Sequence, residues 1–459
     1  MIGRLAARSL TAHPIRSVVL ATGFGAGVAV MAILLGVAEV VLRQAQSPAL
    51  VGGGDVLIQL SPQVPAQLML SGTLQADALR DRIRAASPFA TADLYLTAGG
   101  RTTRVRARAG VPSLEASVGD PETGGAAAWR DTAADEGWRL QPPDRVLRQI
   151  DRFHPIPDAP RWQASWAEWL YFNGRSGSAR FYLTFLVGPR TETGGRASGV
   201  RLQLERGGTL ETFSASATLT DEAVARAPDL TIGGNSVRLD GLTYRIHLDL
   251  SRDGGSRVRA DLTLEASPGR LVPPLEIAGS QGWVTGYVVP VMSGHLNGSL
   301  DVNGDLVSLD NGTGYHDHNW GFWEGVSWQW GQVQHDDLSL LYGRVFPPAD
   351  AADPERLPGF VGVLGPDGPI AYARDVRIAE TNNLAGRPER IDIRARGPAL
   401  ALTVRFDAES AVTTRTTGGP WADGIDFLQL RGRYTVTGRA GSRAIDFTAT
   451  GAAETFRGR

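Results

Sequence analysis

The chain of 459 residues contains no cysteine, and this absence excludes several kinds of site. Disulfides, thiolate catalysis and cysteine-ligated zinc or iron–sulfur centres all need the missing thiol. An excess of one charge is also absent, because 46 Lys and Arg face 48 Asp and Glu and leave a formal net charge of −2. We therefore expect no nucleic-acid partner. The sequence also has no phosphate-binding loop, nucleophile elbow or metalloprotease helix motif.

Glycine and proline, by contrast, are abundant, with 56 and 27 residues and no collagen-like period. This composition indicates many tight turns and therefore a β-rich protein. With 42% hydrophobic and 20% charged residues the chain can bury substantial cores. Its length predicts two or three domains.

An uncharged, apolar segment covers residues 17–38. At about 1.5 Å per residue it is long enough to cross a hydrocarbon core of about 30 Å. Three arginines and no acid precede it, which keeps the N-terminus in the cytoplasm by the positive-inside rule. We predict a cytoplasmic segment at 1–16 and a single transmembrane helix at 17–42 in a bacterial inner membrane, with the rest periplasmic. The alternative is a signal peptide cleaved near 45–47.

The N-terminus also resembles the opening of FtsX-type ABC exporter permeases. The similarity rests on residues 4–10, 13–16 and, after the apolar segment, 53–58. No further segment of comparable length and apolarity follows. The resemblance therefore implies a subunit beside an FtsX-like permease and its ATPase, and not a complete permease.

The remainder of the sequence predicts a mainly β protein. Residues 43–150 indicate a small α+β membrane-proximal module with a strand pair near 93–109 and a Gly- and Ala-rich linker. From about residue 179, short runs of period-two alternation are separated by turn residues, which is typical of antiparallel sandwiches and barrels. We predict two antiparallel barrels in tandem, at 151–285 and 286–459. Closure removes exposed strand edges, and a barrel of about eight strands has room for one ligand.

Two motifs carry a second resemblance. Residues 314–321 read GYHDHNWG, and four tryptophans, Trp320 in this run and Trp323, Trp328 and Trp330 just after it, fall within eleven positions. This run resembles the D-H-N-W-G segment of the carotenoid 1,2-hydratase and AttH family, and residues 168–174, EWLYFNG, resemble that family's E-W-W-Y-x-x-G motif. The resemblance covers residues 151–459. It implies two lipocalin-like (calycin) barrels, the second of which carries the His/Asp/Trp cluster near its pocket, without cofactor or metal.

Family members hydrate acyclic carotenoids, act as pericyclic cyclases or accompany ABC exporters, so the resemblance does not select one chemistry. Hydration of an alkene needs a proton donor, a stabilised cation and a held water. The candidate catalytic residues are Asp317, His318, Trp320 and Tyr342. In the hydratases an acid follows the corresponding tyrosine, whereas Gly343 and Arg344 follow Tyr342 here.

The same motifs have a ligand-binding and a structural interpretation. The candidate ligand-binding residues are Tyr315, His316, Asn319, Trp323, Trp328, Trp330, Glu168, Trp169 and Tyr171. On a strand, His316 and His318 would point to one side and Asp317 and Asn319 to the other, so the segment is equally compatible with a buried hydrogen-bonded corner. Glu168 fits a paired structural acid. His316, His318 and His335 supply three nitrogens for a metal, but His-x-His alone is a weak indication.

The resulting hypothesis is an anchored binding protein for a long apolar molecule, a lipid or isoprenoid, that works beside an FtsX-like exporter. Ligand sites are mostly apolar with a few polar groups, and a tryptophan-rich pocket fits that description. The first alternative is an isoprenoid hydratase. The second is a non-catalytic scaffold of a transporter complex.

Overall fold

The computed structural model describes residues 82–98, 101–119, 130–139, 142–252, 255–366, 368–415 and 426–457, with isolated residues before position 82. The predicted cytoplasmic segment and transmembrane helix lie almost entirely outside this part of the chain. Within it, no helix reaches the length and hydropathy needed to cross a membrane. The chain forms two compact units, one from residues 1–59 and 85–136 and the other from 60–84 and 137–459.

The first unit contains a two-stranded antiparallel hairpin, formed by β1 (Phe89–Ala98) and β2 (Arg101–Gly110). The pairing runs without a register shift, which confirms the predicted strand pair in this region. The short helix α5 (Pro112–Ser117) follows directly and has proline in its first turn, where the missing N–H costs no hydrogen bond.

In the second unit, the first sheet closes on itself. Its strands run in the order β10-β12-β14-β3-β4-β5-β6-β9, and pairing of β9 with β10 completes an eight-stranded barrel, the first barrel. The strands of this sheet are β3 (Trp166–Ser176), β4 (Ala179–Arg190), β5 (Arg196–Arg206), β6 (Thr209–Leu219), β7 (Leu230–Ile232), β8 (Asn235–Asp240), β9 (Thr243–Ser251), β10 (Arg257–Glu265), β11 (Val272–Ala278), β12 (Val284–Val302), β13 (Asp305–Ser308) and β14 (Gly312–Phe322).

The second sheet of this unit has nine antiparallel strands and is nearly closed; we call it the second barrel. Its order is β18-β17-β16-β15-β23-β22-β21-β20-β19, so the ends of the sheet are hairpin partners of the strands beside them. The strands are β15 (Ser327–His335), β16 (Leu338–Phe346), β17 (Phe360–Gly365), β18 (Gly368–Ala373), β19 (Asp375–Asn382), β20 (Pro388–Arg396), β21 (Leu400–Arg415), β22 (Asp426–Ala440) and β23 (Arg443–Arg457).

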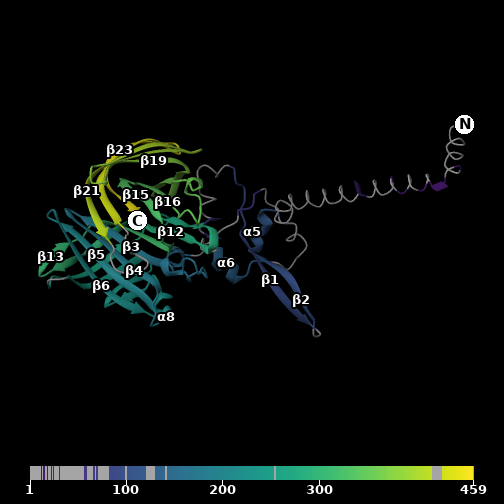
Figure 1. Cartoon of the computed structure of the whole chain (residues 1–459), viewed down its shortest axis with the longest axis horizontal. Helices are drawn as coiled ribbons and strands as arrows, with labels where there is room; N and C mark the ends of the chain where they lie inside the picture. Colours follow the sequence, from purple (N-terminus) through teal and green to yellow (C-terminus); the bar gives the residue numbers. More distant parts are fainter. Residues whose placement is uncertain are drawn as a thin grey trace. The chain divides into compact units, whose positions relative to one another are not determined.

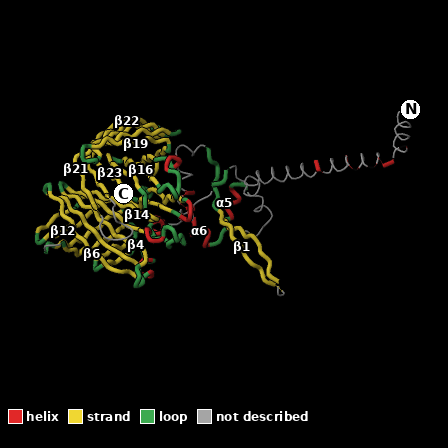
Figure 2. Tube along the Cα trace, in the orientation of Figure 1, coloured by secondary structure: helices red, strands yellow, loops and turns green. Residues whose placement is uncertain are grey.

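Strands dominate the described chain (Figures 1 and 2), and its helices are short. They are α6 (Ala133–Arg139), α7 (Pro143–Ile150), α8 (Asp221–Val224), η1 (Gln163–Ser165), η2 (Ser280–Gly282) and η3 (Pro354–Arg356). The predicted fold class, mainly β with two antiparallel barrels in tandem, is confirmed.

Both barrels are filled by their own side chains. In the first barrel Phe172, Phe181 and Phe185 are at most 1% exposed and belong to one continuous core. Phe406 and Tyr434 occupy the same role in the second barrel. Because protein interiors pack to nearly crystalline density, a ligand cannot enter such a core without displacing side chains. The sequence analysis allowed for a ligand inside an eight-stranded barrel, but side chains fill the described barrel interiors.

The predicted boundary between the barrels needs correction. A break at 285/286 would cut through β12, which pairs with β10 and β14 in the first barrel. The chain crosses to the second barrel only between β14 and β15. The prediction that the second barrel carries the segment 314–321 is therefore wrong. Period-two alternation marks a strand but does not reveal which sheet it joins.

A glycine opposite an aromatic ring tests the packing of the second barrel. A Cβ on Gly331 would overlap the ring of Tyr342 and lie 2.5 Å from Oη of Tyr434. We expect Gly331→Ala to lower the free energy of unfolding by about 1–3 kcal/mol, the usual cost of overpacking. Gly362→Ala is the matched control, because its Cβ would meet only Tyr372, at 3.8 Å. Urea unfolding followed by tryptophan fluorescence measures both, and equal losses would contradict this packing.

Candidate functional site

Strand β14 carries most of the predicted site residues, but it presents them on opposite faces. His316, His318 and Trp320 point into the first barrel, where they contact core aromatics. Tyr315 and Asp317 lie on the outer face, against the second barrel. The expected split between His316 and His318 on one side and Asp317 on the other is confirmed.

The inner face of β14 belongs to a buried ion-pair network, formed by Asp151, His154, Glu168, His316 and His318. Asp151 follows α7, and its two carboxylate oxygens lie 3.0 Å from Nε2 of His316 and 3.1 Å from Nδ1 of His318. Nε2 of His318 lies 2.9 Å from Oε1 of Glu168, which is also 2.7 Å from Nδ1 of His154. The network therefore joins β14 to β3 and to the segment that precedes β3.

Charge pairing decides the protonation of this network. Both ring nitrogens of His318 face carboxylate oxygens, so the ring donates through both and is cationic. Burial opposes that charge, but hydrogen bonds to Asp151 and Glu168 outweigh it and raise the pKa of His318 to about 9. Burial likewise opposes the charge of Asp151, yet His316 and His318 lower the pKa of Asp151 to about 2. The pKa of Glu168 is also lowered, against its burial, by His154 and His318.

These contacts give the network a structural role. Glu168 is fully buried and accepts hydrogen bonds from the backbone N–H of His154 as well as from the two rings. His316 is also fully buried, with its Nδ1 2.9 Å from the carbonyl oxygen of Tyr171. Neither side chain has a free polar atom for a ligand, so their assignment as ligand-binding residues is wrong. The structural interpretation of both motifs accounts for them.

The predicted catalytic residues do not form one site. Trp320 stacks on His154 at 4.1 Å between ring centroids, inside the first barrel with His318. Tyr342 lies in the core of the second barrel, and Asp317 lies between the barrels. Two residues adjacent on a strand point to opposite faces, so Asp317 and His318 cannot act on one substrate atom.

Among the residues that the structure describes, the one group of three or more side chains placed to hold a metal is part of the ion-pair network. Donor atoms of His154, Glu168 and His318 lie within 4.8 Å of one another. Each already has a hydrogen-bond partner in the network. His335, proposed above as a third nitrogen, instead stacks on Phe447 of the second barrel at 4.6 Å.

The outer face of β14 carries a different acid. Asp317 is 4% exposed, accepts a hydrogen bond from Tyr315 Oη at 2.9 Å and another from Nδ2 of Asn319 at 2.7 Å. Trp330 on β15 donates from Nε1 to Tyr315 Oη at 3.1 Å, so the chain of hydrogen bonds crosses from one barrel to the other. Among the described residues of β14, none on the same face as Asp317 is positively charged.

A second carboxyl approaches from the second barrel. Glu454 lies on β23, opposite Trp330 and Gln429 in the sheet register. Burial raises the pKa of Asp317 to about 7, and burial together with the charge of Asp317 raises the pKa of Glu454 to about 8. The two titrate as a pair, and at neutral pH the pair holds at least part of a proton. Glu454 keeps some exposure, so Asp317 is the better shielded carboxyl.

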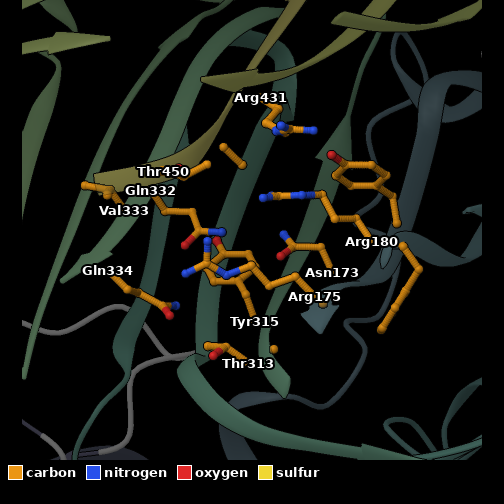
Figure 3. Close-up of a pocket in the computed structure, with 16 residues that line it drawn as sticks. Asn173, Arg175, Arg180, Thr313, Tyr315, Gln332, Val333, Gln334, Arg431 and Thr450 are labelled. Carbon is orange, nitrogen blue, oxygen red and sulfur yellow. The ribbon is translucent and has the colours of Figure 1, made fainter. Parts of the chain in front are cut away.

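An open cleft between the barrels, the inter-barrel cleft, lies beside this acid pair, because its lining residue Tyr315 is hydrogen-bonded to Asp317. Its lining comes from β3, β4 and β14 on one side and β15, β22 and β23 on the other (Figure 3). Its polar lining includes Asn173, Arg175, Arg180, Tyr315, Gln332 and Arg431. Asp317 and Glu454 lie two residues beyond the lining residues Tyr315 and Ala452 on the same strand faces, so the acid pair lies at one end of the cleft.

The other predicted site tryptophans, Trp169, Trp323, Trp328 and Trp330, gather where the barrels meet. Trp169 lies 4.7 Å from Trp323, and Trp328 stacks on Phe456 of β23 at 4.0 Å with nearly parallel rings. Trp330 and Tyr171 belong to the apolar cluster between the barrels. The structure thus brings seven predicted ligand-binding residues to the junction, since Tyr315 and Asn319 lie there too.

Sequence reasoning missed Asp151, His154, Glu454, Arg180 and Arg431. Asp151 and His154 lie in an irregular segment between α7 and β3 that contains no motif. Glu454 and Arg431 look like ordinary outward positions in alternating strands. The one available indication was that Glu454 follows two alanines on its strand. A strand face that another domain covers carries fewer charged residues than an exposed face, so a face with a single acid among small side chains indicates a covered position.

Comparisons with known proteins find no matching family model and no matching curated protein. Among solved structures the chain is similar to kievitone hydratase from Nectria haematococca, with 13% identity, a TM-score of 0.43, and coverage of 66% of this chain and 93% of that chain. The chain is also similar to CghA, with 12% identity, a TM-score of 0.42, and coverage of 69% of this chain and 96% of that chain. A putative AttH from Nitrosomonas europaea is similar with 13% identity, a TM-score of 0.43, and coverage of 66% of this chain and 98% of that chain. With TM-scores below 0.5, these likenesses carry no functional argument, and none supports the FtsX resemblance.

The ion-pair network predicts how stability depends on pH. Unfolded chains release the His318 proton near pH 6.5, whereas the folded protein keeps it until about pH 9. Between these values the unfolded state binds fewer protons, so His318 lowers the free energy of unfolding as pH rises by on the order of 3 kcal/mol, and the raised pKa values of Asp317 and Glu454 add to this fall. We expect urea unfolding to show this fall in wild type and in His247→Gln, an exposed control. A fall of the same size in His318→Gln would refute the assignment.

Proposed function

We propose that this chain is a binding protein whose ligand occupies the inter-barrel cleft. The observation that carries the proposal is that residues of six strands, from two barrels with filled interiors, line one common cleft. Ligand sites combine an apolar surface with a few polar groups. The cleft supplies the polar groups, and the cluster that includes Tyr182, Tyr315 and Trp330 supplies the apolar surface. A lipid or isoprenoid with a polar end fits this combination.

The proposal includes membrane anchoring by residues 17–42 and association with an FtsX-like exporter and its ATPase. The uncharged segment and the N-terminal resemblance support these parts. A binding site held next to the bilayer would meet apolar molecules at high local concentration.

Filling the cleft tests the proposal. Thr450→Trp places an indole among the lining residues, whereas Thr448→Trp places one on the same face of β23 at an exposed position. We expect solvent extraction of the purified full-length protein, followed by mass spectrometry, to recover an apolar molecule from wild type and from Thr448→Trp. Recovery from Thr450→Trp should fall at least tenfold. An empty wild-type protein, or equal recovery from both variants, would overturn the binding proposal.

The acid pair favours a second candidate, hydration of an alkene. A carboxyl that keeps its proton near neutral pH is a suitable general acid. Protonated Asp317 would give its proton to one alkene carbon, and the ring of Trp330 would stabilise the cation. Water would attack the other carbon and return one proton to the carboxylate. This scheme uses Asp317 and Trp330, and assigns no catalytic step to His318, Trp320 or Tyr342.

Labelled water tests this candidate. Incubation with an acyclic carotenoid in isotopically labelled water should label the product with wild type, and at least a hundredfold more slowly with Asp317→Asn, which has no acidic proton. The rate with wild type should fall as pH rises through 7 to 8, because the pair then loses its proton. Tyr342→Phe, in the core of the second barrel, should leave the rate nearly unchanged. The absence of label with wild type excludes hydration of these substrates.

A further inference from the structure

Three arginines from both sides of the inter-barrel cleft line it. Arg175 and Arg180 come from the β3–β4 hairpin of the first barrel, and Arg431 comes from β22 of the second. Figure 3 shows Arg180 and Arg431 pointing into the same space. Arg431 pairs with Glu205 at 3.0 Å and more weakly with Glu409 at 3.5 Å. Within the described part of the chain, Arg175 and Arg180 have no carboxylate partner.

The arrangement concentrates positive charge in a partly buried place. Of the acids near the group, Glu205 and Glu409 pair with Arg431, and Glu409 also pairs with Arg433, whereas the acid pair lies at the end of the cleft. Nε of Arg431 is buried and has no hydrogen-bond partner among the described residues. Burial lowers the pKa of Arg180, and the charges of Arg431 and Arg175 lower it further, while the charge of Glu205 acts in the opposite direction. Like charges held this close disfavour each other unless an anion joins them.

We propose that the ligand of the inter-barrel cleft is an amphipathic acid, whose carboxylate or phosphate group binds Arg175, Arg180 and Arg431. This inference rests on the proposed binding function and names the chemical class of its ligand. Guanidinium groups bind carboxylate and phosphate through paired, charge-assisted hydrogen bonds. Asn173 and Gln332, which also line the cleft, add amide donors. The apolar part of the ligand lies against Tyr182, Tyr315 and the apolar cluster behind them.

Two ligands with the same chain and different head groups test the proposal. Dodecanoate and dodecan-1-ol are titrated by calorimetry into the full-length protein in zwitterionic lipid nanodiscs at pH 8, with empty nanodiscs as the baseline. We expect dodecanoate to bind at least tenfold more tightly than dodecan-1-ol. Arg180→Gln should weaken dodecanoate about tenfold or more, as the loss of a charge-assisted hydrogen bond does, and leave dodecan-1-ol unchanged. Arg238→Gln, on the exposed face of β8, should change neither.

The outcomes separate this inference from the function on which it rests. If both ligands bind equally and Arg180→Gln affects neither, the acidic head group is wrong but the binding function stands. If neither binds, both proposals fail for ligands of this kind. Inorganic phosphate distinguishes a free anion from an amphipathic acid, because displacement of dodecanoate by phosphate at equal affinity would overturn the amphipathic part. Arg175→Gln provides a second variant, and unchanged unfolding midpoints confirm that the variants are folded.

Discussion

Strand β14 is buried on both faces, and much of the remaining structure depends on this constraint. Its inner face carries His316 and His318 into the ion-pair network, and its outer face carries Tyr315 and Asp317 toward the second barrel. A slip of one residue would exchange the two faces and place the imidazoles between the barrels. The network therefore fixes the register of β14 against β3. The same register places Asp317 at the end of the inter-barrel cleft.

The two faces also show how surroundings decide the state of an acid. Asp151 has two imidazole partners, and their attraction outweighs its burial and lowers its pKa. Asp317 has only neutral donors close to it, so burial prevails and raises its pKa. Breaking a buried pair leaves an uncompensated charge and costs about 3–5 kcal/mol, which makes the inner network a strong constraint on register. The outer acids carry no such penalty and can exchange protons with a bound molecule.

The strands and the tandem barrels could be predicted from the local sequence, because period-two alternation and turn residues indicate which positions are buried. Both motifs could be read directly from the sequence. It did not reveal that the motifs at 168–174 and 314–321 pair with each other, Glu168 opposite Trp320, in one barrel. Pairing over such a separation leaves no local trace. Asp317 and His318 were assigned to one catalytic site although alternation along a strand already places neighbouring residues on opposite faces. Glu454 and Arg431, on the second barrel, became relevant only because the first barrel covers their faces.

A site between two barrels differs from one inside a barrel, because binding and domain packing then share the same contacts. The barrels are joined at the cleft by Trp330 with Tyr315, Gln429 with Tyr171 and Arg431 with Glu205. An anion among the arginines competes with Glu205 for Arg431 and replaces one cross-barrel ion pair with a bridge through the ligand. Occupancy of the cleft must therefore change the stability of the barrel interface, and the interface must change affinity by the same free energy.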